Sequence, residues 1–114
     1  MTADFQVSLS LDIADEADNL LPISPLLEQN YPNPFNPSTT ITVNLKKNSN
    51  LSVDVYNILG HHINQLLNGK YSARQISTVW DGTDSEGNEV PSGVYFYVVS
   101  TDDEQESRKM TLLK

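Results

Sequence analysis

The sequence predicts an all-β fold, an antiparallel β-sandwich of about seven strands. Three observations support this class. Short stretches in which apolar and polar residues alternate recur about every ten residues, which is the spacing expected for sandwich strands. Asn, Ser, Thr and Asp, which favour turns and strand surfaces, are abundant, whereas only 19% of the chain is charged. No stretch has the periodicity of a helix of useful length, and 114 residues suffice for one domain.

The N-terminal region, residues 1–25, is expected to lie outside the main domain. Residues 5–13 alternate without a fault, so their apolar side chains share one face of a half-buried strand. Residues 14–19 are acidic and unpatterned, which indicates a solvated linker. This region is either the end of an upstream part of the protein or an extra strand on the domain formed by residues 26–114.

A proline-rich stretch, residues 31–41, leads into the first strand of the main domain. Proline fixes its own φ, removes a donor and disfavours the α region for the residue before it. Closely spaced prolines therefore predict an extended, polyproline-like path rather than a helix. The two aromatic residues of the stretch are the expected anchors of this path to the core. The motif residues are Tyr31, Pro32, Pro34, Phe35 and Pro37.

Two strands are predicted directly after this stretch. Residues 40–45 and 51–56 both alternate, and a polar turn separates them. They are expected to form either a hairpin or a pair that crosses between two sheets. The turn that follows ends at Gly60, and Ile58 and Leu59 are expected to be tucked under it.

The middle of the chain is predicted to supply two further strands. Residues 61–67 alternate more weakly, which indicates a strand with a β-bulge. Asn68–Gly69 is a strong signal for a tight turn after that strand. Residues 76–80 then alternate again, and we expect Trp80 to be a buried core anchor, as in other sandwiches.

The C-terminal part contains a polar loop and two strands. Residues 81–93 form a long loop with three glycines. Residues 94–100 are the most β-prone run of the chain and predict either a central strand covered on both faces or one with an aromatic face left partly open. Tyr95 and Tyr97 share one face of this strand, where packing between the sheets is favoured over a sugar- or peptide-binding patch. Residues 107–113 are predicted to form the last strand.

Composition excludes several classes of function. The formal net charge of −8 argues against a nucleic-acid partner, because binding to phosphate backbones depends on clusters of Lys and Arg. The absence of cysteine excludes disulfides, thiolate catalysis and cysteine-ligated metals. No run of about 18 apolar residues is present, so the sequence predicts no transmembrane segment. The first residues also lack the basic start and apolar core of a signal peptide.

We predict no catalytic, cofactor-binding or metal-binding residues, and no cofactor. The adjacent residues His61 and His62 would point to opposite faces of a strand, so they do not suit one metal ion. No serine lies in the sequence context of an activated nucleophile, so an enzyme is not expected. Oxygen ligands in the 81–93 loop do not follow the EF-hand spacing, and a turn is favoured over a calcium site. These oxygen ligands are Asp81, Asp84, Glu86 and Asn88.

Five blocks of sequence occur in an order that resembles a known family. They are residues 31–39 (YPNPFNPST), 55–60 (VYNILG), 80–84 with 87–88 (WDGTD and GN), 91–97 (PSGVYFY) and 109–114 (KMTLLK). Over residues 26–114 this order resembles the C-terminal sorting domain (type A) of type IX secretion cargo. The WDG and SGVY blocks are also similar to the Ig-like domain of flagellar hook-capping proteins.

This resemblance implies an Ig-like sandwich at the C-terminus of a larger secreted protein. In the sorting family the domain directs its cargo, via the periplasm, to an outer-membrane translocon of a Gram-negative-type bacterium and so to the outer cell surface. A surface sortase can then remove the domain, and the cargo can be attached to lipopolysaccharide. The chain stops directly after the fifth block, which agrees with a native C-terminus.

The sorting signal is expected to be a surface that the fold presents. We expect residues 107–114 to pair beside the strand 94–100 and to expose their end. The candidate recognition residues are Gly93, Tyr95, Lys109, Met110, Thr111, Leu112, Leu113 and Lys114. Trp80, Asp81 and Gly82 are expected to be structural, like the proline-rich motif. The alternative function is a structural or adhesive Ig-like interaction module of the hook-capping kind, with a protein partner and no processing.

Overall fold

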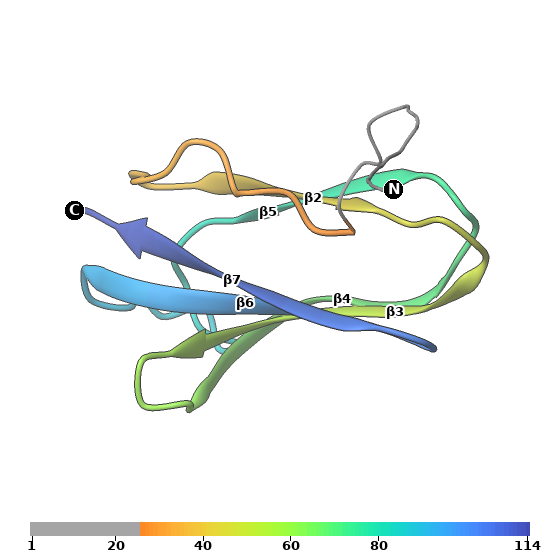
Figure 1. Cartoon of the computed structure of the whole chain (residues 1–114). Helices are drawn as coiled ribbons and strands as arrows, with labels where there is room; N and C mark the ends of the chain where they lie inside the picture. The colour runs from red at the N-terminus through yellow and green to blue at the C-terminus, as the bar shows by residue number, and fades with distance from the viewer. Residues whose placement is uncertain (1–25) are drawn as a thin grey trace, which may run out of the picture.

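Two antiparallel β-sheets pack face to face in the computed structural model, which describes residues 26–114 (Figure 1). The smaller sheet pairs β2 (Thr39–Asn44) with β5 (Gln75–Trp80). The larger sheet has the order β4-β3-β6-β7, and its strands are β3 (Ser49–Asn57), β4 (His62–Tyr71), β6 (Gly93–Thr101) and β7 (Gln105–Leu112). The predicted all-β sandwich is confirmed. The strand expected at residues 5–13 and the linker at 14–19 lie outside the described residues.

Alternation along the strands explains the core. In β3, for example, Leu51, Val53 and Val55 are buried, whereas the residues between them are more exposed. Each fully buried aliphatic side chain contributes about 1.5–3 kcal/mol relative to its exposed state. The largest fully buried side chains are Trp80, Tyr97, Phe35, Leu27, Ile41, Leu51 and Met110. Within residues 26–114, no helix is long and apolar enough to cross a membrane.

The pairing of β2 decides between the two arrangements left open by the sequence. β2 pairs with β5, with Val43 opposite Ile76, and β3 pairs with β4 and β6 in the other sheet. The chain therefore crosses from one sheet to the other between β2 and β3 instead of forming a hairpin. The predicted central position of β6 is confirmed, because it lies between β3 and β7.

β4 confirms the predicted bulge and corrects the predicted turn. Its register with β3 shifts twice, which leaves Ile63 and Leu66 as extra residues without a partner in the ladder. The tight turn expected at Asn68–Gly69 is wrong, since both residues belong to β4. A two-residue hairpin turn needs positive φ, and Gly69 is not among the glycines with positive φ. The ring of Tyr71 fills the space beside it, with Cε1 3.7 Å from where a Cβ would lie.

The lead-in, residues 26–38, joins the edges of the two sheets. Leu27 and Tyr31 form isolated bridges with β2, and Phe35 forms one with Leu112 of β7. The backbone bends at residues 32–34 and 36–37, so the expected polyproline-like path is wrong. The cause is the change of partner, because the chain must turn to leave β2 and reach β7.

The two aromatic residues of the lead-in have different environments. Phe35 is only 2% exposed and is the predicted anchor to the core. Tyr31 is 80% exposed, so its prediction as a second anchor is wrong. Tyr31 is held by its backbone instead: its N–H donates to Thr40 O at 3.0 Å and its carbonyl accepts from Thr40 N at 2.9 Å.

Candidate functional site

The five sequence blocks converge on one end of the sandwich, which we call the motif end. Figure 1 shows the C-terminus, the turn between β3 and β4 and the start of β6 at this end. Gly93 lies opposite Leu112 in the register of β6 and β7, and Tyr95 lies opposite Asn57 in that of β6 and β3. Phe35 bridges to Leu112, which brings the proline-rich block to the same place.

Three aromatic rings from three of the blocks form the centre of the motif end. The rings of Phe35 and Trp80 are 5.6 Å apart, and those of Trp80 and Tyr95 are 5.2 Å apart in an edge-on arrangement. Such pairs contribute about 0.5–1.5 kcal/mol beyond burial. The polar atoms of the rings are satisfied, because Trp80 Nε1 donates to Thr83 O at 2.8 Å and Tyr95 Oη donates to Pro91 O at 2.7 Å. Burial raises the pKa of Tyr95, which keeps the phenol neutral.

The Asp81–Gly82 turn closes against the end of the last strand. Gly82 has φ of 79°, a left-handed conformation that favours glycine. A Cβ at this position would lie 3.4 Å from Leu112 Cδ2 and 3.5 Å from Pro37 O. Asp81 accepts a hydrogen bond from Thr83 Oγ1 at 2.6 Å, which fixes the turn. The glycine therefore supplies the backbone conformation of a turn that packs against Leu112 and Pro37.

Two of the six residues of the terminal block face the core, and the others are exposed or partly exposed. Met110 and Leu112 are buried, whereas Lys109, Leu113 and Lys114 are exposed and Thr111 is intermediate. This division follows from the two-residue period of a strand. The expectation that all six residues form a recognition surface is thus corrected for Met110 and Leu112. Of the other two candidates, Tyr95 is buried and Gly93 begins β6.

The lead-in occupies the outer edge of this terminal block. Phe35 N donates to Thr111 O, and Leu113 N donates to Phe35 O, both at 3.0 Å. Asn33 Oδ1 also accepts from Thr111 N at 3.0 Å. These bonds satisfy main-chain groups that an edge strand would otherwise leave unpaired. The terminal block is therefore a fixed part of the fold.

A small hollow lies where the chain end meets the glycine turn. Its volume is about 210 Å³. Lys114 contributes to its rim, and is held there because its N–H donates to Ser92 Oγ at 3.0 Å and its Nζ lies 3.2 Å from Glu89 Oε1. Both the ammonium and the carboxylate are partly or largely exposed, so this ion pair adds little stability. The lining residues are Asn36, Pro37, Asp81, Gly82, Glu89, Leu112 and Lys114.

The polar loop between β5 and β6 is ordered by its own hydrogen bonds. Asp84 Oδ1 accepts from Glu86 N and from Asn88 N, both at 2.9 Å. This is the bonding expected of a turn. Among residues 26–114, no group of three His, Asp or Glu side chains converges in a way that could hold a metal ion. His62 contacts Asp54 at 2.8 Å across the neighbouring strand.

A tyrosine clamp on the lead-in was missed from the sequence. Tyr97 Oη lies at the buried side of the lead-in, where it donates to Glu28 O and accepts from Asn30 N, both at 2.8 Å. The Asn30 side chain is also buried and donates to Pro32 O at 3.1 Å and to Thr39 Oγ1 at 2.9 Å. The available signal was the inward parity of Tyr97, since a buried tyrosine hydroxyl needs a partner.

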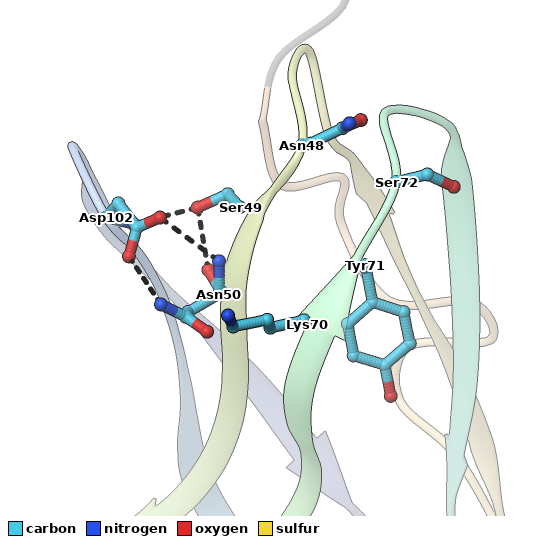
Figure 2. A pocket seen from close by; sticks show the side chains of 7 residues that line it. All are labelled: Asn48, Ser49, Asn50, Lys70, Tyr71, Ser72 and Asp102. Carbon is cyan, nitrogen blue, oxygen red and sulfur yellow. Dashed lines mark hydrogen bonds between the residues drawn. The ribbon is translucent and has the colours of Figure 1, made fainter.

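The opposite end of the sandwich contains a larger, polar hollow of about 450 Å³. Figure 2 shows Asp102 beside Ser49 and Asn50 within it. Asp102 accepts from Asn50 Nδ2 at 3.0 Å and from Asn50 N at 3.2 Å. The side-chain bond from Asn50 is the main reason why the pKa of Asp102 is lowered. One face of the Tyr71 ring is taken by the Arg74 guanidinium, 5.8 Å from the ring centroid. Asp102, Ser49 and Asn50 are therefore joined to one another by hydrogen bonds.

Comparisons with known proteins agree with the fold and the blocks. Residues 26–113 match the family model of the CHU_C type IX secretion signal domain. PorU from Porphyromonas gingivalis is similar in structure, with a TM-score of 0.61 and 24% identity over 90% of this chain and 10% of the PorU chain. PorZ, an essential surface component of the type IX secretion system of the same organism, has a TM-score of 0.55 and 20% identity over 75% of this chain and 11% of that chain.

A third similar structure belongs to the hook-capping class. FlgD from P. aeruginosa has a TM-score of 0.53 and 27% identity, and the match covers 77% of this chain and 74% of the FlgD chain. The chain spans only about a tenth of the lengths of PorU and PorZ. No sequence among the curated proteins matches it.

The structural likenesses confirm the Ig-like sandwich, and the family model covers most of the chain. Membership of this family implies interaction with the secretion machinery and secretion to the cell surface or the extracellular space. The chain belongs to the type IX secretion signal domain family, a family of non-catalytic sorting domains.

Proposed function

We propose that the chain is the C-terminal sorting domain of a larger cargo protein. It directs that cargo from the periplasm through the outer-membrane translocon of the type IX system to the surface of a Gram-negative-type bacterium. The observation that carries this proposal is the convergence of all five blocks on the motif end, where the terminal block is held as part of β7. The domain itself is non-catalytic and needs no cofactor.

The receptor reads a folded surface rather than a linear peptide. The outward side chains of Lys109, Leu113 and Lys114 are the accessible part of the terminal block, whereas Met110 and Leu112 are core residues. Deleting the whole block would therefore remove core packing and the signal together. A test of recognition must change the outward side chains alone.

The experiment compares two double variants in a bacterium that has a type IX system. The chain is fused to the C-terminus of a periplasmic reporter, and reporter activity is measured outside the cell. L113S/K114Q changes two outward residues of the terminal block. V79S/K46Q makes matching exchanges, an aliphatic residue to Ser and Lys to Gln, at exposed positions away from it. Val79 lies on β5, and Lys46 lies in the connection between β2 and β3.

The wild-type fusion and V79S/K46Q are expected outside the cell, and L113S/K114Q is expected to stay in the periplasm. Both variants should keep the thermal stability of the wild type, because all four side chains are exposed. Equal secretion of the two variants would contradict recognition of this surface. Failure of the wild-type fusion would contradict the sorting function itself.

A separate proposal concerns what happens to the cargo at the cell surface, and it rests on the family resemblance. A surface sortase removes the domain, with cleavage in the linker at residues 14–19, and the cargo is attached to lipopolysaccharide. Mass spectrometry of the surface-bound cargo tests this. A mature C-terminus beyond Tyr31 would contradict cleavage in the linker.

The alternative function is a structural Ig-like module of the hook-capping kind. The similarity to FlgD, which extends over 74% of that chain, favours it. A structural module predicts a protein assembly without export of a fused reporter. The secretion experiment therefore separates the two functions directly.

A further inference from the structure

The turn between β3 and β4 exposes two adjacent aliphatic side chains. Ile58 is 67% exposed and Leu59 is 75% exposed. The sequence predicts that both are tucked under the turn, and this prediction is wrong. Single exposed aliphatic residues are common on protein surfaces. Two neighbours on one turn, within one of the five blocks, call for another reason.

Hydrogen bonds hold this turn in a single conformation. Asn57 Oδ1 accepts from Leu59 N and from His61 N, both at 2.9 Å. The backbone of Asn57 also accepts from Gly60 N and donates to His61 O, both at 3.0 Å. Gly60 supplies the left-handed backbone, with φ of 84°. The aliphatic pair is therefore presented by a preorganised turn, which lowers the entropic cost of binding.

An apolar hollow adjoins the exposed pair. Its volume is about 340 Å³ and its lining is mainly apolar. It lies between the turn and the start of β6. Among its lining residues are Ile58, Leu59, Ile63, Val90, Pro91 and Tyr95. The exposed pair and the hollow together offer both a projection and a recess to a partner.

This surface is continuous with the terminal block. Ser92 lines the hollow and accepts the hydrogen bond from Lys114 N at 3.0 Å. Gly93, which also lines it, lies opposite Leu112 in the ladder of β6 and β7. A partner that binds the end of β7 would therefore reach the hollow without a gap.

We propose that Ile58 and Leu59 form a docking knob that inserts into an apolar recess on a protein subunit of the secretion machinery. The inference rests on the proposed sorting function and adds a second contact to its recognition surface. A protein partner is favoured over an anionic membrane because residues 26–114 hold ten acidic against seven basic side chains and residues 57–60 include no Lys or Arg. A second copy of the chain is the remaining occupant and is an outcome of the test.

The test uses I58S/L59S in the full chain fused to the periplasmic reporter, with V79S as the control. Val79 is 58% exposed on β5, so V79S removes a comparable exposed aliphatic side chain elsewhere. Secretion of I58S/L59S is expected to fall about tenfold at unchanged Tm, as for loss of a binding hot spot. I58V/L59M, which keeps the knob apolar, is expected to retain normal secretion. If I58S/L59S lowers Tm, secretion of the single variant L59Q is measured instead and tests the proposal.

Normal secretion of I58S/L59S beside a secreted wild type would overturn the docking proposal and leave the sorting function intact. Failure of the wild-type fusion would overturn both. Two further measurements test the other two partners of the knob, a second copy of the chain and a membrane. A wild-type dimer in sedimentation equilibrium that I58S/L59S abolishes would assign the knob to self-association. Binding to phosphatidylglycerol vesicles that I58S/L59S abolishes would assign it to a membrane.

Discussion

The two ends of the sandwich differ in how their side chains are satisfied. At the far end several polar groups are hydrogen-bonded within the protein: Asp102 accepts from Asn50, and Asn48 Oδ1 accepts from Ala73 N at 2.9 Å. At the motif end the adjacent aliphatic side chains of Ile58 and Leu59 are exposed to solvent. The volume of a hollow does not by itself identify a binding site, because the polar hollow at the far end is larger than the apolar hollow at the motif end.

This difference indicates which end of the sandwich gains more free energy when a partner covers it. In the polar hollow, hydrogen bonds within the protein already engage Asp102 and Asn50, so a ligand of these groups would have to replace those bonds. Exposed aliphatic side chains gain free energy from any contact that removes them from water. The motif end is therefore the end at which a partner adds most stability. Substitutions at the two ends test this comparison.

The largest expected effect comes from the core of the motif end. F35A removes a ring that packs on Trp80 and is 2% exposed, so the free energy of unfolding should fall by about 3–5 kcal/mol. Y31A, in the same block, should change it by less than about 0.5 kcal/mol, because the Tyr31 side chain is 80% exposed. Urea unfolding followed by Trp80 fluorescence measures both. Equal losses would show that the block acts through both aromatic residues.

The strands were predictable from the sequence, whereas their neighbours were not. β2, β3 and β5 each contain a clear alternating stretch, β4 alternates weakly, and β6 is a continuous β-prone run. Alternation defines which face is buried and carries no information on which strand lies beside it. The partner of β2 therefore came only from the structure. The turn at Asn68–Gly69 failed because Lys70 and Tyr71 continue the ladder with Asn50 and Ser49.

The candidate site was predictable as a set of blocks but not as a surface. Their order indicated a sorting domain, and alternation places Met110 and Leu112 on one face, yet the outward orientation of Ile58 and Leu59 depends on packing. A turn residue has no periodicity from which a face can be read. The contact of Tyr97 with Asn30 joins residues far apart in the sequence, so no local pattern indicates it.

A smaller effect is expected from the clamp on the lead-in. Y97F removes the hydroxyl that bonds to Glu28 O and Asn30 N, and leaves both backbone groups without this partner. The free energy of unfolding should fall by about 1–3 kcal/mol. Because the clamp holds the lead-in from its buried side, the variant should also increase amide exchange at residues 28–31. Unchanged exchange would show that the bridges to β2 and β7 suffice.

The same tyrosine gives the domain a pH dependence. Burial is the main cause that raises the pKa of Tyr97 above its ordinary value. The folded state therefore favours the protonated phenol, and this stabilisation is complete below the pKa of the unfolded chain. It is lost as the pH rises from about 10 towards the raised pKa. Urea midpoints measured between pH 8 and 11 should fall less steeply for Y97F than for the wild type, after allowance for the other tyrosines.

Two glycine variants separate backbone conformation from contact at the motif end. G82A and G87A both place a side chain at positive φ, which costs about 1–2 kcal/mol. At Gly82 the new Cβ also meets Leu112 and Pro37, whereas at Gly87 it meets no atom within 4 Å among the described residues. These distances are ordinary van der Waals contacts, so the two variants should lose a similar free energy of unfolding, set by the backbone conformation. A clearly larger loss for G82A would show that the contact with the end of β7 leaves no room for a methyl group.

The smallest effect is expected at the far end. D102N replaces an exposed carboxylate whose pKa is lowered, first by the side-chain bond from Asn50. A lowered pKa stabilises the fold only above the ordinary range of aspartate, and this contribution disappears as the pH falls through the lowered value. D102N should therefore match the wild type in acid and differ only slightly at neutral pH. Secretion should be unchanged, because Asp102 lies at the far end and its carboxylate is already hydrogen-bonded to Asn50. A D102N fusion that stays in the periplasm at unchanged Tm would place a recognition contact at the far end and would contradict the assignment of partner binding to the motif end alone.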